Sequence, residues 1–208
     1  NSNYDITYVG ALLTINQLAV TVTADAKSKT YGQVDPALTF VSAPTVGTVL
    51  ANGEVIAFTG ALSRVAGEDV GTYAINQNTL TYGANYNETY VGADLTITVA
   101  SLTVTADNKT KVYDGAVYSP FTVTYSGFVG GDDETDLGGT LAFTGTATTA
   151  INVGTGYVIT PGGLTSSNYT ISFVNGTLDI TTRPITITAD AKTKVYGATD
   201  PALTYQIT

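Results

Sequence analysis

A nine-residue motif, Thr-Ala-Asp-x-Lys-x-Lys-x-Tyr, occurs three times in this chain of 208 residues. Its copies begin at Thr23, Thr105 and Thr188. They are therefore 82 and 83 residues apart. A second motif, Asn-Tyr followed four residues later by an aromatic residue and Val, recurs at the same spacings from Asn3, Asn85 and Asn168. A repeat of this length indicates an array of small domains, each large enough to bury a modest core.

The two motifs divide the chain into four segments. Residues 1–16 match the closing strands of a preceding repeat, 17–99 and 100–182 are complete repeats, and 183–208 match the opening strands of a following repeat. Strands of such half-repeats have unpaired edges and apolar faces, so we expect a neighbouring repeat or another copy to complete them. Alternatively, each half packs as a cap on its complete neighbour. The side chains that distinguish these arrangements are Tyr4, Ile6, Tyr8, Ile185 and Ile187.

Short stretches of alternating apolar and β-branched residues predict strands. Leu18, Val20 and Val22, for example, alternate with Ala and Thr, and no window has a sustained 3.6-residue apolar period. With Gly and Asn turns between the strands, this pattern favours an all-β chain of tandem antiparallel, Ig-like β-sandwich domains. A β-grasp-like sheet with a short helix is the main alternative, and a helical turn would fit best within residues 45–64.

Connections between the predicted domains are short. Only about two residues separate the last predicted strand of the first repeat, 94–99, from the first strand of the second, 102–107, which is too few for a flexible tether. We therefore expect successive domains to be arranged end to end.

Charge and the length of the apolar runs argue against two kinds of partner. The net charge is −9 and the isoelectric point is near 4.1, whereas nucleic-acid binding requires clustered Lys and Arg. No apolar run approaches the roughly 20 residues of a membrane helix, so we expect no membrane insertion in this segment. We expect any export signal or anchor to lie outside these residues.

Several catalytic groups are missing from the composition. The chain has no His and no Cys, which excludes a cysteine nucleophile, an imidazole base and an ordinary transition-metal site. We therefore expect neither an enzyme nor a cofactor.

One acidic loop offers the only candidate metal site. It contains Asp132, Asp133, Glu134 and Asp136 on a Gly-rich backbone. Carboxylates of this kind suit Ca²⁺, which takes six to eight oxygen ligands, but the spacing is not that of an EF-hand loop. A solvated loop without a metal is the simpler interpretation.

The basic residues are concentrated in the motif. All six lysines form Lys-x-Lys pairs, namely Lys27 with Lys29, Lys109 with Lys111, and Lys192 with Lys194. At a spacing of two, both members of a pair share one face of a strand. The simplest interpretation is protection of an edge strand against unwanted pairing. Contact with acidic groups of a neighbouring repeat or chain, a Lys–Asn isopeptide crosslink and binding of an anionic ligand are the alternatives.

Tyrosine is the dominant aromatic residue, with 14 copies against six Phe. Exposed Tyr can bind sugar rings, so a glycan-binding surface is one hypothesis. Tyr73, Tyr125, Tyr157 and Tyr169, however, lie in strand patterns in step with apolar neighbours. For these residues we expect core or half-core packing instead.

Taken together, these motifs resemble a known family. Thr-Ala-Asp-x-Lys-x-Lys-x-Tyr-Gly, followed by Asp-Pro-Ala-Leu-Thr at 35–39 and 200–204, resembles the MBG repeat, YGX type, of bacterial surface proteins. The second repeat, with Val-Tyr-Asp-Gly at 112–115 and Gly-Thr-Gly-Tyr at 154–157, resembles the related YDG repeat.

The resemblance implies an extracellular, structural role. Such repeats form long strings in secreted or surface-attached bacterial adhesins and filamentous-haemagglutinin-like proteins. The expected function is a non-catalytic segment of an adhesin, stalk or filament, located at the cell surface or secreted. Its expected partners are neighbouring repeats or copies of itself, and a host or matrix glycan or protein. The alternative is a glycan-binding module that uses exposed Tyr.

Overall fold

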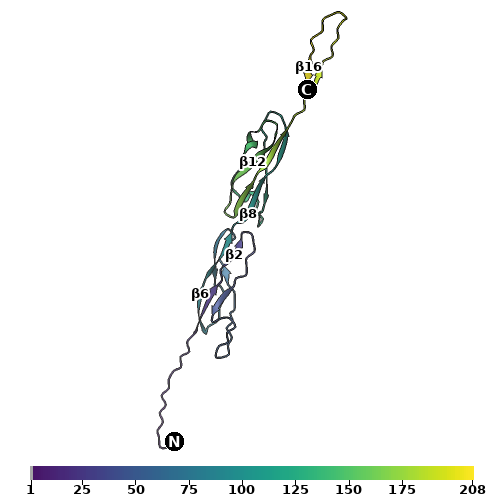
Figure 1. Cartoon of the computed structure of the whole chain (residues 1–208). Coiled ribbons are helices and arrows are strands. Elements are labelled where there is room, and N and C mark those ends of the chain that lie inside the picture. Colours follow the sequence, from purple (N-terminus) through teal and green to yellow (C-terminus); the bar gives the residue numbers. More distant parts are fainter. Residues whose placement is uncertain (1) are drawn as a thin grey trace. The chain divides into compact units, whose positions relative to one another are not determined.

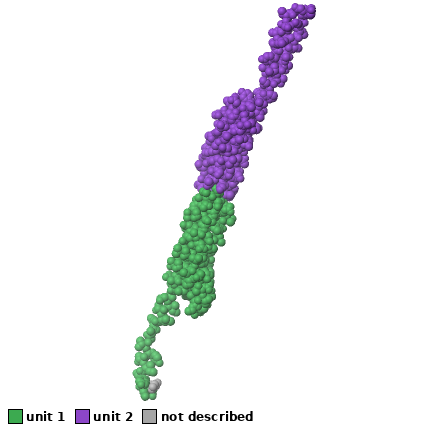
Figure 2. All heavy atoms as spheres, viewed as in Figure 1, with its two compact units in different colours: residues 1–100 green, residues 101–208 purple. Residues whose placement is uncertain are grey.

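The structure, a computed structural model, describes residues 2–208 and divides into two compact units, residues 1–100 and 101–208 (Figure 2). The described residues form strands, turns and loops, and their only helices are two short 3₁₀ segments. The predicted all-β fold is therefore confirmed. No helical turn forms within 45–64, where backbone bridges join Val49 to Val55 and Thr59 to Thr81 instead.

The first unit contains seven strands in two sheets (Figure 1). The strands are β1 (Leu18–Ala24), β2 (Lys27–Thr30), β3 (Phe40–Ala43), β4 (Ser63–Arg64), β5 (Gly71–Asn76), β6 (Tyr86–Val91) and β7 (Ala93–Thr98). One sheet has the order β3-β1-β6, and the other has the order β2-β7-β5-β4.

The first and last segments of this repeat run in parallel. β1 pairs with β6 from Leu18–Tyr86 to Thr23–Val91, and β2 pairs with β7 from Lys27–Leu95 to Thr30–Thr98. Both segments change sheet at the same level, β1–β2 after Ala24 and β6–β7 at Gly92. The sheets are thus mixed, which corrects the expectation of antiparallel sheets. The alternating pattern predicted strands, but it carries no information on the direction of pairing.

The second unit repeats this plan. Its first sheet, β10-β8-β13, contains β8 (Ala100–Ala106), β10 (Val123–Ser126) and β13 (Tyr169–Val174). Its second sheet, β11-β12-β14-β9, contains β9 (Lys109–Val112), β11 (Gly138–Thr144), β12 (Gly154–Thr165) and β14 (Gly176–Thr181). β14 pairs with β9 in parallel, as β7 does with β2. The 3₁₀ segments, Glu134–Asp136 and Thr146–Thr149, lie on either side of β11.

Alternation along the strands builds the core of each unit. Val20 and Val22 of β1 are fully buried, and Ile56 and Leu80 from the connecting loops pack against them. A second cluster joins Ala24 to Ile75 and Leu95, and so brings together side chains of both sheets. In the second unit, Ile159, Leu178 and Ile180 form the corresponding cluster with Ala106, Ala147 and Ala150.

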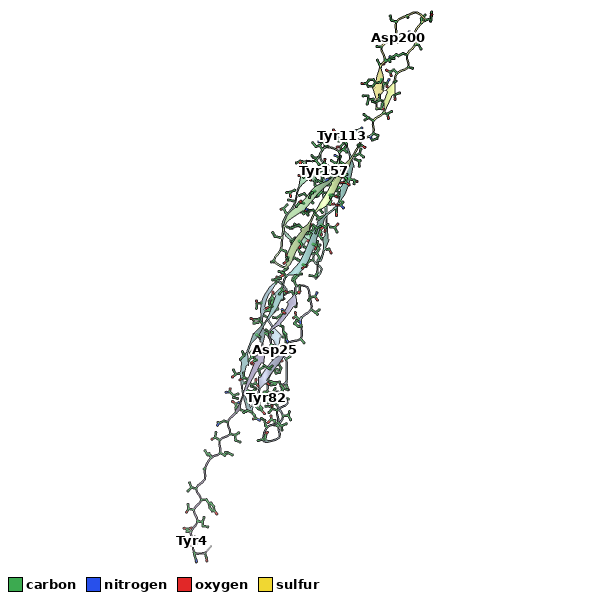
Figure 3. The ribbon with its side chains drawn as sticks, viewed as in Figure 1. Tyr4, Asp25, Tyr82, Tyr113, Tyr157 and Asp200 are labelled. Carbon is green, nitrogen blue, oxygen red and sulfur yellow. The ribbon has the colours of Figure 1, made fainter. Side chains whose placement is uncertain are left out.

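The two end segments contribute nothing to these cores. Residues 2–17 form no strand and are exposed throughout, as Tyr4 in Figure 3 illustrates. Residues 187–189 and 205–207 form a hairpin of β15 (Ile187–Ala189) and β16 (Tyr205–Ile207). The side chains that would be buried in a cap, Tyr4, Ile6, Tyr8, Ile185 and Ile187, are 58–89 % exposed. The cap arrangement is therefore not formed, and completion by a neighbour or another copy stays a prediction.

The strand register shows that the terminal hairpin corresponds to the opening strands of a complete repeat. Ala24 pairs with Phe40 in the first unit, Ala106 with Val123 in the second, and Ala189 with Tyr205 in the hairpin. In each case the Ala precedes the Asp of the repeated motif.

Candidate functional site

The Lys-x-Lys motif lies on an edge strand in both complete repeats. β2 and β9 each end their sheet, and each is paired on one side only, with β7 and β14 respectively. This position is the one that edge-strand protection requires, because a Lys on an unpaired edge disfavours pairing with another chain.

In both complete repeats the first lysine of the pair takes part in a polar clip with the motif Asp and a Thr that precedes the next strand. In the first repeat, Lys27 Nζ donates to Thr39 Oγ1 at 2.6 Å, and Thr39 in turn donates to Asp25. Asp25 lies at the turn between β1 and β2 (Figure 3). The clip therefore ties the point where the chain changes sheet to the segment entering β3.

The clip recurs with the repeat. Lys109 Nζ donates to Thr122 Oγ1 at 2.7 Å, and Thr122 donates to Asp107. In the terminal hairpin, Thr204 donates to Asp190. The motif Asp and its Thr thus remain paired even where only the opening part of a repeat is present.

The second lysine of the first repeat lies in an ionic cluster with Asp35, Arg64 and Glu68. Lys29 Nζ is 2.8 Å from Asp35 and 2.5 Å from Glu68, and only 4 % of its side chain is exposed. Arg64 contacts both acids, with Nε 2.5 Å from Asp35 and Nη2 2.5 Å from Glu68. The cluster joins the loop after β2 to β4 and the loop that leads into β5.

Three further contacts fix the guanidinium of Arg64. Its Nη1 donates to the carbonyls of Val65 and Gly67 at 2.9 and 2.6 Å, and its Cζ lies 5.5 Å from the centre of the Tyr73 ring. A bidentate, stacked Arg of this kind is poorly replaced by Lys, because an ammonium cannot form the same fork of hydrogen bonds.

Mutual hydrogen bonding shifts the titration of the cluster. Hydrogen bonds from Arg64 and then Lys29 lower the pKa of Asp35 to about 2, below its ordinary 3.8. Hydrogen bonds to Asp35 and then Glu68 raise the pKa of Lys29, and those from Lys29 and Arg64 lower the pKa of Glu68. All members are therefore held in their charged forms near neutral pH.

The other repeats use the second lysine differently. Lys111 Nζ lies 2.6 Å from Asp114 and donates to the Ala116 carbonyl at 2.7 Å, so it closes its own turn. Lys194 pairs with Asp200, which is equivalent to Asp35 (Figure 3). The motif lysines described above, Lys27, Lys29, Lys109, Lys111 and Lys194, all contact groups of their own repeat. Their partners are carboxylates, Thr hydroxyls and one backbone carbonyl. The predicted contact with a neighbouring repeat stays a prediction.

Sequence reasoning missed Arg64 and Glu68. Both lie outside the repeated motif, and Arg64 has no basic counterpart in the second repeat. The available signal was the rarity of arginine, which occurs only at 64 and 183, together with the spacing of four residues between Arg64 and Glu68.

The acidic loop is used for local structure. Asp133 caps the 3₁₀ segment, because its carboxylate accepts a hydrogen bond from the Thr135 N–H at 2.8 Å. The Asp136 carboxylate accepts a hydrogen bond from the Asp133 N–H at 2.9 Å. Asp132 accepts from the Tyr169 hydroxyl at 2.7 Å. Among residues 2–208 the acids do not gather into a group that could hold a metal ion. The loop that we considered for Ca²⁺, including Glu134, therefore has no assembled ligand set.

Tyrosines of the complete repeats are largely packed. Tyr169 is 5 % exposed, Tyr73 and Tyr157 pack against the core clusters, and Tyr125 is half-buried beside Phe128. The predicted core or half-core packing of these four residues is thus confirmed. Within residues 18–182, Tyr113 alone is exposed, with 39 % of its surface accessible (Figure 3).

These features define a tandem array of all-β repeat modules with a recurrent Asp–Thr clip. The MBG domain (YGX type) family model matches residues 20–96, 102–179 and 185–208, so the chain belongs to this family. The same model matches the second repeat, which had suggested the YDG type. The family is a repeat module of surface proteins. Searches of curated proteins and of solved structures each found no match. No helix among the described residues is long and apolar enough to cross a membrane.

Proposed function

We propose that this chain is a non-catalytic segment of a long extracellular adhesin, stalk or filament, in which successive MBG repeats follow one another end to end. The observation that carries the proposal is the parallel pairing of opening with closing strands, β1 with β6 and β2 with β7 in the first repeat and β9 with β14 in the second. Because β1–β2 and β6–β7 run in the same direction, the chain enters the first repeat at one pole and leaves at the opposite pole.

The distance between these poles follows from the strand geometry. Residues 18–30 advance by about 3.3 Å each, so entry and exit lie about 40 Å apart. Had the first and last strands been antiparallel, both ends of the chain would lie at one pole, and successive repeats would have to branch sideways. With parallel opening and closing strands, each additional repeat lengthens the array.

A short connection supports the same arrangement. Only Val99 separates β7 from β8, so a single residue connects the last strand of the first repeat to the first strand of the second. A connection of this length is far below what a flexible linker needs to let two domains fold back on each other.

Residue chemistry supports the non-catalytic part of the proposal. The chain has neither His nor Cys, and the acids with the lowered pKa values cited above are paired with Lys29 and Arg64. A catalytic acid–base pair would instead require carboxyl groups whose pKa values are separated and close to the working pH.

The test is to locate the protein on its native cell. Antibodies raised against residues 17–182 should label intact, unpermeabilised cells or the culture medium, and brief protease treatment of intact cells should remove the cell-bound signal. Labelling that requires permeabilisation, together with resistance to the protease, would contradict the extracellular stalk.

A glycan-binding module is the second candidate. Within residues 18–182 only Tyr113 is exposed, so the complete repeats carry no cluster of two or three exposed tyrosines, and the other exposed tyrosines, Tyr4, Tyr8, Tyr196 and Tyr205, lie in the two end segments. We therefore favour the stalk, with neighbouring repeats or further copies of the chain as its contacts and a host or matrix molecule as the target of the complete protein. Binding of residues 1–208 to a glycan array, lost in Tyr113→Ala, would favour the module instead.

A further inference from the structure

We propose that the parallel pairing of the opening strands with the closing strands is a mechanical clamp, which lets each complete repeat resist tension applied along the array. The inference rests on the proposed stalk function and specifies what the fold contributes to it. A stalk that tethers a cell experiences force between its ends, and that force passes through each repeat from its first strand to its last.

Tension along the array loads the clamp in shear. In the first repeat, force applied to Leu18 pulls β1 towards the entry pole, whereas force applied to Thr98 pulls β7 towards the exit pole. The two segments are paired over six residues between β1 and β6 and over four between β2 and β7. Backbone hydrogen bonds between parallel strands lie across the direction of the force, so they must all be strained together before the strands slide.

Side chains strengthen the clamp at both of its levels. Val20 and Val22 of β1 and Tyr86 of β6 belong to one buried cluster, so sliding would pull packed side chains out of the core. At the exit pole the Tyr31 N–H donates to the Thr98 carbonyl at 2.8 Å, and Thr98 Oγ1 donates to the Lys29 carbonyl at 3.2 Å. These contacts continue the pairing past the end of β2.

The second repeat has the same clamp. β8 lies beside β13, and β9 pairs in parallel with β14 from Lys109–Leu178 to Val112–Thr181. Its exit pole carries the equivalent bonds, Tyr113 N–H to Thr181 and Thr181 Oγ1 to the Lys111 carbonyl. The Tyr that follows the Lys-x-Lys motif thus closes the clamp in both complete repeats.

Direction of pulling distinguishes a clamp from general stability. When two parallel strands are pulled apart at their shared starting ends, their bonds break one after another. Asn16 and Asn85 are exposed and lie at the starts of β1 and β6, where the Leu18 N–H donates to the Asn85 carbonyl. The chain has no Cys, so a pair of introduced cysteines defines the points of attachment.

The experiment is single-molecule force spectroscopy on residues 1–208. Pulling from the two termini should give two high-force events, each lengthening the chain by about 250 Å as roughly 80 residues are released. Pulling the Asn16→Cys/Asn85→Cys variant through its thiols should unfold the first repeat at a severalfold lower force, although its thermal unfolding without load matches that of the unmodified protein.

Equal forces in the two directions, or a lower force from the termini, would overturn the clamp. That result would leave the location of the protein on the cell untouched. Failure of the surface-labelling experiment would remove the stalk while the measured dependence on direction stood, so the two proposals fail separately.

Discussion

Asp35 is the residue on which the ionic cluster of the first repeat depends. It holds both cations, and without it Lys29 would stay buried with Glu68 as its only remaining acid partner in the cluster. We expect Asp35→Asn to destabilise the first repeat by about 1–2 kcal/mol, because Asp35 itself is 40 % exposed and solvent screens part of the interaction. Urea unfolding should show this loss, whereas Asp94→Asn, at an exposed acid of the same repeat, should change stability by less than about 0.5 kcal/mol.

Stability that depends on Asp35 should vary with pH in one direction. The pKa of Asp35 is about 2 in the folded repeat and near 3.8 ordinarily, so the unfolded chain binds the proton more readily. The contribution is therefore fully present above pH 4 and is lost as the pH falls towards 2. The difference between the unmodified protein and Asp35→Asn should shrink over that window. A difference that stays constant down to pH 2 would show that charge is not its cause.

Ile56 shows how much of the core lies outside the strands. It is fully buried against Val20 and Val22, although it comes from a long connecting segment. We expect Ile56→Ala to cost about 2–5 kcal/mol, since it removes buried methyl groups and leaves a cavity. Val55→Ala, which changes a 51 % exposed neighbour, is the matched control and should have little effect in calorimetry of the first repeat. Comparable losses in both variants would place Ile56 outside the core.

The positions of individual side chains could be predicted only where the repeated motif or the strand pattern marked them. The motif identified the lysine positions, and the period-two pattern identified Val20 and Val22 as an inward face. Arg64 and Glu68 were missed because their meeting with Lys29 depends on contacts between residues about 35 positions apart. No local sequence pattern encodes such long-range contacts. The alternation of a strand, by contrast, can be read from consecutive residues.

Gly176 begins β14 where the closing segment changes sheet. A Cβ placed there would lie 2.4 Å from the Ala106 carbonyl oxygen, so the opening and closing segments approach more closely than a side chain allows. We expect Gly176→Ala to destabilise the second repeat by about 1–3 kcal/mol through this overlap. Gly162→Ala in β12 is the control, because a Cβ there meets nothing within 4 Å. Equal melting temperatures for the two variants would contradict the close approach.

Strands were easier to predict than their partners. The sequence indicated short strands at β1, β7 and β10, but it favoured antiparallel sheets because Gly and Asn turns are typical of hairpins. Parallel partners, such as β1 and β6, lie more than 60 residues apart and have no turn between them to reveal their register. The feature that supports the stalk most directly was therefore not foreseeable from the pattern.

The end segments should be dispensable for the complete repeats. Residues 2–14 and 184–208 contain no buried side chain, although they carry many apolar residues. Deleting both segments should therefore change the unfolding free energy of each complete repeat by less than about 0.5 kcal/mol. A larger loss in calorimetry would show that these segments pack on the repeats in solution.

We propose end-to-end extension of the two complete repeats, and one distance tests this proposal. Asn85 lies at the entry pole of the first repeat and Thr182 follows β14 at the exit pole of the second, and both are exposed. Spin labels on cysteines at these positions should lie about 80 Å apart in pulsed electron paramagnetic resonance, twice the strand-derived length of one repeat. Labels at Asn85 and Val99 calibrate a single repeat at about 40 Å. A distance between Asn85 and Thr182 at or below that of the single repeat would mean that the repeats fold back on each other, which would contradict the proposed end-to-end extension.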